Sequence, residues 1–184
     1  MFLVKPSIER LRGYVDALER GWSPDTIRLA KVTREQLNEI RQDADAFVEG
    51  LDDPEARGAP IPMPDGSFAP RLPGIRRWMW DGEFSGSIGL RWSPGTPVLP
   101  PTCLGHIGYA VVPWKRDLGY ATAALAQILP EARKLDLPYV ELVTDVDNLA
   151  SQRVILANGG TLVEPFQKGR AQGGGDALRF RIEL

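Results

Sequence analysis

One short stretch of the chain combines basic and small residues in an order that suits an anion. Gly119 follows Arg116 by three residues, and Ala121 comes two residues later. The stretch begins after an apolar run that ends at Pro113, and it opens a run with helical spacing. The first amides of a helix are unpaired and the helix dipole favours negative charge there. The stretch 111–125 therefore predicts a cradle for a pyrophosphate.

The neighbouring side chains strengthen this interpretation without making it unique. Lys115 and Arg116 add positive charge, Thr122 offers a hydroxyl, and Gly119 lets the backbone approach a ligand closely. The pattern matches neither the dinucleotide motif G-x-G-x-x-G nor the phosphate loop G-x-x-x-x-G-K-[ST]. Taken alone, it fits equally well a glycine that only permits a tight turn from strand to helix. A nucleotide-phosphate binder is a further alternative.

The composition is that of an ordinary globular protein. The chain has 184 residues, of which 43% are hydrophobic and 25% charged, and this predicts one domain over residues 1–184. A net charge of -2 gives no basic field for nucleic acid. There is no apolar run of about 18 residues, so we expect no membrane span. The first residues lack the pattern of a signal peptide.

The single cysteine, Cys103, excludes an internal disulfide and fits a reducing cytoplasm. Zinc-type cysteine and histidine spacings are absent, so we expect no metal site. Cys103 and His106 are three residues apart, which on a strand places them on opposite faces. We therefore interpret Cys103 as a passive thiol rather than a nucleophile.

Hydrophobic periodicity and turn residues predict an α/β or α+β fold. The expected strands are 2–4, 76–80, 84–92, 106–112, 139–144, 159–166 and 178–184. The expected helices are one that starts after Ser7, one that Thr33 caps and that ends near Gly50, one from Leu118 to Leu135, and one from Ala150 to Ala157.

Three further features carry specific expectations. Pro130 inside the third helix predicts a bend or a new helix start there. Trp78 and Trp80 lie on one face of a strand by the period of two, which favours the core or the sheet surface over a pocket. The segment 57–74 is rich in proline and glycine, and it is either a surface connection or a cover for a substrate, with a turn at 65–67.

Five segments, in order along the chain, resemble the GNAT superfamily of N-acetyltransferases, and most closely a bacterial branch of it. They are DGEFSGSIGLR, GHIGYAVVP, RDLGYATAAL, DNLASQRVILANGG and RFRIEL. The signature is a strand, then [QR]-x-x-G-x-[GA] opening a helix, then a strand, an asparagine and a short helix that ends in glycine. The resemblance implies a mostly antiparallel central sheet flanked by helices. It also implies that the strand ending at Val112 splays from the strand at 139–144.

The same resemblance implies that the cofactor is acetyl-CoA. Its pyrophosphate would lie on the amides of residues 116–122, and its pantetheine arm would pair with the exposed backbone of the preceding strand. Asn148 would contact the pantetheine or brace the short helix, and Ser151 would be its partner in capping that helix. The implied cofactor-binding residues are Val111, Val112, Lys115, Arg116, Asp117, Leu118, Gly119, Tyr120, Ala121, Thr122, Asn148 and Ser151.

The resemblance further implies direct attack of a neutral amine on the thioester, with a base to take the proton. A backbone N–H, expected at Val112, would stabilise the oxyanion. His106 is a candidate base because an imidazole titrates near neutral pH. The alternative is a structural role, in which His106 caps the strand or packs beside Trp92. Glu83 and Glu141 are rival carboxylates.

The short helix departs from the family pattern at one position. The family commonly has a general-acid tyrosine where this chain has Ile155. Tyr109 and Tyr120 are present, but the sequence does not place either at the sulfur. A non-catalytic acyl-CoA-binding or sensor module is therefore a second hypothesis. The expected acceptor is a primary amine of a small molecule or peptide, and a homodimer is an expectation from the family alone.

Overall fold

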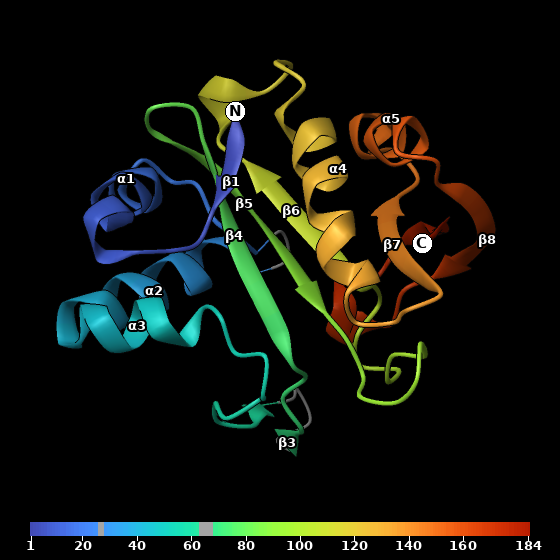
Figure 1. The fold of residues 1–184 in the computed structure, drawn as a ribbon, viewed down its shortest axis with the longest axis horizontal. Helices are drawn as coiled ribbons and strands as arrows, with labels where there is room; N and C mark the ends of the chain where they lie inside the picture. Colours follow the sequence, from blue (N-terminus) through green and yellow to red (C-terminus); the bar gives the residue numbers. More distant parts are fainter. Residues whose placement is uncertain (26–27, 63–67) are drawn as a thin grey trace.

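The computed structural model of the protein describes residues 1–25, 28–62 and 68–184. Within these ranges the chain forms an α+β fold with five α-helices and antiparallel sheets (Figure 1). The helices are α1 Ile8–Glu19, α2 Leu29–Gln42, α3 Ala44–Gly50, α4 Tyr120–Arg133 and α5 Leu149–Ala157. The strands are β1 Phe2–Val4, β2 Ile61–Pro62, β3 Phe68–Ala69, β4 Gly74–Trp80, β5 Phe84–Arg91, β6 Ile107–Val111, β7 Tyr139–Asp145, β8 Thr161–Gln167 and β9 Asp176–Glu183. The predicted turn at 65–67 lies outside the described residues.

The strands form two principal sheets and one short pair. The first sheet has the order β1-β4-β5-β6 and the second the order β7-β9-β8, while β2 pairs with β3. All of these pairings are antiparallel. Strands β6 and β7 are therefore outer strands of different sheets. A backbone bond of 2.8 Å from the His106 N–H to the Glu141 carbonyl joins them just before β6 begins.

Helices cover both faces of the first sheet. In Figure 1, α1, α2 and α3 lie to the left of β4, and α4 lies to its right. The α4 side holds the larger core, where Leu125 and Ile128 pack in one buried cluster with Ile88. On the α1 side, Tyr14 stacks on Trp78 with the ring centroids 5.1 Å apart. Trp78 is fully buried, so the prediction of a core role is confirmed for it.

The second predicted helix is wrong in its start and in its length. Helix α2 begins at Leu29, and Thr33 lies inside it with its hydroxyl donating to the Leu29 carbonyl at 2.9 Å. A threonine inside a helix can bond back to the carbonyl four residues earlier, so it does not need to cap. The helix then stops before Asp43, whose carboxylate accepts from the Ala46 N–H at 2.9 Å and caps α3.

The expected new helix start at Pro130 is also wrong, because α4 runs without a break from Tyr120 to Arg133. Proline removes the bond that its N–H would donate to the carbonyl four residues earlier. That carbonyl belongs to Ala126, and both Ala126 and Pro130 are exposed. Water can reach the unpaired carbonyl there, so the helix accepts the proline on its solvent side.

Candidate active site

The start of α4 presents unpaired backbone donors. Gly119 is the N-cap residue and has a left-handed backbone with φ 74°. The first bond of the helix runs from the Ala123 N–H to the Gly119 carbonyl at 3.0 Å. The amides of Tyr120, Ala121 and Thr122 therefore have no acceptor within the helix. A Cβ atom on Gly119 would meet nothing within 4 Å, so the space beside these amides is open.

A cluster of charged groups fixes the turn that leads into α4. The Lys115 ammonium lies 2.6 Å from one Asp81 oxygen and 2.8 Å from the Glu83 carboxylate. The Tyr120 hydroxyl donates to the other Asp81 oxygen at 2.6 Å. Burial alone would raise the pKa of Asp81, but the hydrogen bonds from Lys115 and Tyr120 outweigh it and hold the pKa well below its usual range. The β4–β5 turn is thereby tied to the turn before α4.

This cluster engages the side chains of two residues expected to contact a cofactor, and that contact stays a prediction. The polar ends of Lys115 and Tyr120 bind Asp81, so they serve the turn itself. Arg116 and Asp117 remain exposed, and Leu118 is 59% exposed. Arg116 is therefore the cation of this stretch that is left to face a phosphate.

The backbone N–H expected to stabilise an oxyanion already has an acceptor in the fold. The Val112 N–H donates to the Ser85 carbonyl at 3.1 Å, so it points toward β5 and is already used. Successive N–H groups of a strand point to opposite edges. The Val111 N–H therefore lies on the outer edge of β6. Gly86, opposite Val111, permits the close approach of β5 at this point, since a Cβ there would lie 2.4 Å from the Ala110 carbonyl oxygen.

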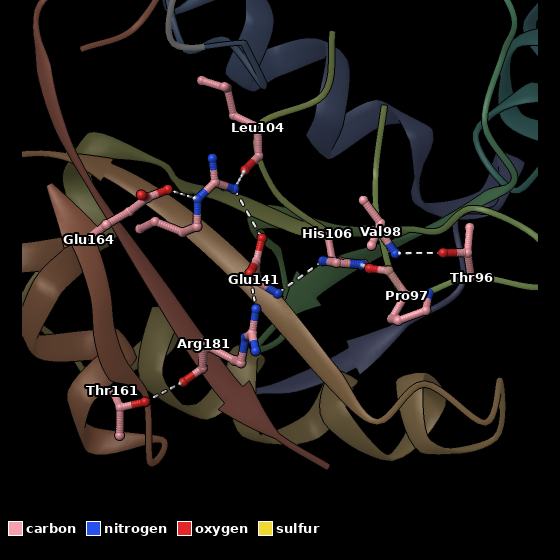
Figure 2. Close-up of polar contacts among 10 residues, drawn as sticks. Thr96, Pro97, Val98, Leu104, His106, Glu141, Thr161, Glu164 and Arg181 are labelled. Carbon is pink, nitrogen blue, oxygen red and sulfur yellow. Dashed lines mark hydrogen bonds and ion pairs between the residues drawn. The ribbon is translucent and has the colours of Figure 1, made fainter. Parts of the chain in front are cut away.

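At the other end of β6, His106 is fully buried and both of its ring nitrogens are bonded (Figure 2). The Nδ1 atom accepts from the Glu141 N–H at 2.9 Å. Because Nδ1 accepts, Nε2 carries the proton and donates to the Pro97 carbonyl at 3.1 Å. Burial is the main cause that lowers the pKa of His106. This geometry favours the structural role of His106 over the role of a base.

The carboxylate of Glu141 is held by two arginines from β9 (Figure 2). Arg181 donates to it at 2.8 Å and Arg179 at 3.0 Å. Burial alone would raise the pKa of Glu141, but the hydrogen bonds from Arg181 and Arg179 outweigh it and lower the pKa. The third candidate base, Glu83, binds Lys115. All three candidate bases thus carry structural bonds.

A family model described as "Acetyltransferase (GNAT) domain" matches residues 34–161. The chain belongs to the GNAT acetyltransferase family. The matched residues include the start of α4, strand β6 and the His106–Glu141 contact. The protein is thus a member of an enzyme family that uses acetyl-CoA to acetylate amines.

Solved GNAT structures share this fold at low sequence identity. Microcin C7 self immunity acetyltransferase MccE, in complex with acetyl-CoA and AMP, is 14% identical with a TM-score of 0.65, and the match covers 99% of this chain and 91% of that one. RimL, the ribosomal L7/L12 alpha-N-protein acetyltransferase, in complex with coenzyme A, is 14% identical with a TM-score of 0.65 and coverages of 99% and 93%. A mutant of spermidine N-acetyltransferase SpeG from Vibrio cholerae is 13% identical with a TM-score of 0.60 and coverages of 100% and 95%. No curated protein sequence matches the chain.

In this GNAT protein, Asn148 caps α5. Its side-chain oxygen accepts from the Ser151 N–H at 3.1 Å, which confirms the predicted partnership of the two residues in capping. Their contact with a coenzyme stays a prediction. Ile155 is buried in the core, so the position where the family commonly has a tyrosine is filled by an apolar side chain.

Sequence reasoning left Tyr109 without a position, and the structure supplies one. Its hydroxyl reaches from β6 to the first turn of α5 and donates to the Ser151 hydroxyl at 3.2 Å. Burial is the main cause that raises the pKa of Tyr109. The alternation along 106–112 carries the only sequence signal, because it puts Tyr109 on the same face as Ile107 and Val111, the side that packs with α4 and α5.

Within the described ranges, no helix is long and apolar enough to span a membrane, and no three His, Cys, Asp or Glu residues are grouped for a metal ion.

Replacing His106 by alanine should lower stability rather than acetylation chemistry. The change leaves the Glu141 N–H and the Pro97 carbonyl unpaired, and we expect a loss of about 1–3 kcal/mol in the free energy of unfolding at pH 7.5. Because the pKa of His106 is lowered on folding, protonation favours the unfolded chain. The free energy of unfolding of the wild type should fall as the pH drops below about 6.5. Urea unfolding should find a smaller fall in the variant, because His106 is the single histidine of the chain. A variant of unchanged stability that has lost acetylation would instead support His106 as the catalytic base.

Replacing Asp81 by asparagine should loosen the turn before α4. We expect the free energy of unfolding to drop by about 1–3 kcal/mol at pH 7. The low folded-state pKa of Asp81 means that its contribution is complete above the unfolded value near 3.9 and is lost as the pH falls below it. Urea unfolding from pH 7 to pH 3 should therefore find the two proteins converging. Asp16→Asn, at an exposed pair with Arg12, is the control and should change stability by less than about 0.5 kcal/mol. A constant difference at all pH values would contradict the assignment.

Proposed function

We propose that this GNAT protein is an acetyl-CoA-dependent N-acetyltransferase that transfers an acetyl group to a primary amine by direct attack on the thioester. The observation that carries the proposal is the start of α4, where the amides of residues 120–122 lack helical acceptors beside open space at Gly119. Such a helix start binds phosphate groups. The outer edge of β6 leads directly to it.

The residues of the cradle fit the pyrophosphate of coenzyme A. Arg116 and the amides of residues 117–122 would hold its phosphate oxygens, because they are positively charged or are free donors. The pantetheine arm would lie along the outer edge of β6, where the Val111 N–H is directed away from β5. A splay between β6 and β7 would admit it. This part of the proposal is supported by their separate sheets and by their backbone bond at His106.

Bound acetyl-CoA would supply the acetyl group as an activated thioester. The Val111 N–H would stabilise the negative charge that develops on the carbonyl oxygen during attack. The amine must be neutral to attack, and with His106, Glu83 and Glu141 held in structural bonds, water is the acceptor for its proton. Tyr109 is our candidate donor to the departing thiolate, because its raised pKa keeps the phenol protonated.

A second function has an observation in its favour. The three candidate bases are bonded within the fold, and Ile155 replaces the tyrosine of the family pattern. A module that binds acyl-CoA without turnover would retain the cradle and β6 and would not need these groups. Either function fits the reducing cytoplasm that the single Cys103 suggests.

Calorimetric titration with acetyl-CoA tests the proposal, with Gly119→Trp as the decisive variant. A tryptophan at Gly119 would fill the open space beside the free amides, and we expect acetyl-CoA binding to fall by at least about 100-fold, the loss of two or more charged hydrogen bonds. The matched control is Gly95→Trp. Gly95 has the same φ of 74° and equally open surroundings, but it lies in the loop that follows β5, at the opposite end of β6.

The two variants share their backbone strain, so only the cradle distinguishes them. Binding by the wild type and by Gly95→Trp, but not by Gly119→Trp, supports the coenzyme site. An amine panel then separates the enzyme from the non-catalytic module by turnover. Equal binding by all three proteins would place the coenzyme elsewhere, and no binding by any would remove the basis of the proposal.

A further inference from the structure

Two arginines converge on one face of the first sheet. Arg76 of β4 lies opposite Gly89 of β5, and Gly89 lies opposite Gly108 of β6. Arg91 is two residues beyond Gly89 on the same strand, so it occupies the diagonal position to Arg76. Diagonal neighbours in a sheet are about 7–8 Å apart, within reach of long side chains. Both arginines project on the side of the sheet that faces α1.

The two guanidinium groups lie over glycines of the sheet. A Cβ atom on Gly89 would be 3.8 Å from the Arg76 Cζ atom, and one on Gly108 would be 3.4 Å from an Arg91 nitrogen. Gly89 and Gly108 are direct cross-strand partners. The two positive charges therefore share one small area, which we call the arginine patch: Arg76 and Arg91 above Gly89 and Gly108.

The charges of the arginine patch are only partly compensated within the described residues. The Arg76 guanidinium has one side-chain contact there, with the Ser87 hydroxyl at 3.5 Å, which is at the limit of a hydrogen bond. Neither Arg76 nor Arg91 forms an ion pair in the described part of the chain. Other arginines of the two sheets do form ion pairs: Arg77, Arg179 and Arg181.

Two groups of opposite charge tendency act on Arg76, the Tyr14 hydroxyl and the Asp25 carboxylate. The Asp25 carboxylate also accepts from the Arg28 backbone N–H at 2.7 Å and from the Arg28 guanidinium at 3.0 Å. Burial is the main cause that lowers the pKa of Arg76, and the charge of Arg91 lowers it further, whereas Tyr14 and Asp25 act to raise it. Two residues further along β4, the buried Trp78 indole N–H has no acceptor within the described residues. This face thus combines two positive charges that form no ion pair within the described residues with one unpaired indole N–H.

We propose that the arginine patch binds an oxyanion, a carboxylate or a phosphate, that the amine acceptor carries. Guanidinium groups donate parallel hydrogen bonds to both of these planar or tetrahedral anions. An anion here would supply the charge partner that the described residues do not. The acceptor class is therefore an amine that also bears a carboxylate or phosphate.

The position of the arginine patch fits an acceptor. Gly108 lies three residues before Val111 on β6, a span of about 10 Å along the strand. An acceptor with its amine near Val111 could reach the arginine patch with an anionic group at its other end. This link to the acceptor rests on the proposed function, whereas anion binding by Arg76 and Arg91 does not.

Anion-dependent thermal stability tests the binding site without any acetylation. Unfolding midpoints are measured in sodium acetate, sodium phosphate and sodium chloride at equal ionic strength. A ligand that binds only the folded protein raises its midpoint. We expect the wild type to gain about 3–6 °C over chloride in acetate or phosphate once the anion exceeds its Kd roughly tenfold. Arg76→Gln and Arg91→Gln should lose this gain.

The matched control is Arg77→Gln, on the same strand but paired with Asp52. It should retain the full anion-dependent gain, whatever its own midpoint. A gain in acetate alone that Arg76→Gln removes assigns a carboxylate site, and a gain in phosphate alone that Arg76→Gln removes assigns a phosphate site. A phosphate gain that persists in Arg76→Gln and Arg91→Gln belongs to the start of α4 and would overturn a phosphate site at the arginine patch. Equal gains in all four proteins would reflect general salt effects and would overturn the proposal, as would the absence of any gain in the wild type.

Matched acceptors then test the substrate class. Amines with a free carboxylate or phosphate are compared with their methyl esters for kcat/KM. We expect the wild type to favour the anionic form by about 10–100-fold, and Arg76→Gln to lose that preference while keeping its affinity for acetyl-CoA. Wild-type turnover without such a preference would overturn the acceptor class. Failure of acetyl-CoA to bind the wild type would count against the proposed function, and the anion-dependent midpoints would still decide the site.

Discussion

The reciprocal contact between His106 and Glu141 sets the geometry on which the rest of this protein depends. The His106 backbone N–H donates to the Glu141 carbonyl, and the Glu141 N–H donates to the His106 ring. The His106 imidazole thus accepts the Glu141 N–H in place of a backbone carbonyl, next to the backbone bond between the same two residues. The two sheets are fixed to each other at this point, and β6 keeps an outer edge beyond it. Arg179 and Arg181 hold the Glu141 carboxylate and so hold the contact from the other side.

The opposite end of β6 is fixed by a second set of charges. Asp81 binds both Lys115 and Tyr120, so the turn before α4 is tied to the β4–β5 turn. Strand β6 is therefore held at both ends. Its outer edge lies between the His106–Glu141 contact and the Asp81 contacts, and the free amides of α4 lie next to the Asp81 contacts. Donors that are already in place lose little freedom when a ligand binds. His106, Glu141 and Lys115, which the sequence offers for catalysis or binding, make the bonds that hold β6 at its two ends.

Much of the fold could be predicted because it depends on local patterns. The alternation along 76–92 and 178–184 and the helical spacing after Gly119 each define an element without reference to distant residues. Thr33 shows the limit, since a threonine can cap a helix or bond back inside one, and packing decides between them. Pro130 shows a second limit of local patterns. The free-energy cost of a proline inside a helix depends on whether the unpaired carbonyl faces solvent, and here it does.

The site was less predictable because side-chain roles depend on partners far along the chain. The sequence predicts Lys115 as a phosphate ligand, but it cannot show that Asp81, 34 residues earlier, lies beside the Lys115 ammonium. The sequence also predicts the Val112 N–H as an oxyanion donor, but it does not give the register that pairs this N–H with Ser85. The glycine turn at Gly119 and the free amides of α4 could be predicted because they are local properties, whereas their binding of a pyrophosphate stays a prediction.

Residue-resolved amide hydrogen exchange, measured by NMR with and without acetyl-CoA, tests the central claim most directly. The claim is that the outer edge of β6 and the start of α4 form one binding surface. It requires that Val111 and residues 120–122 gain protection when acetyl-CoA is added, while Val112, already bonded to Ser85, changes little. Protection that appears elsewhere, with Val111 and residues 120–122 unchanged in the bound state, would contradict it.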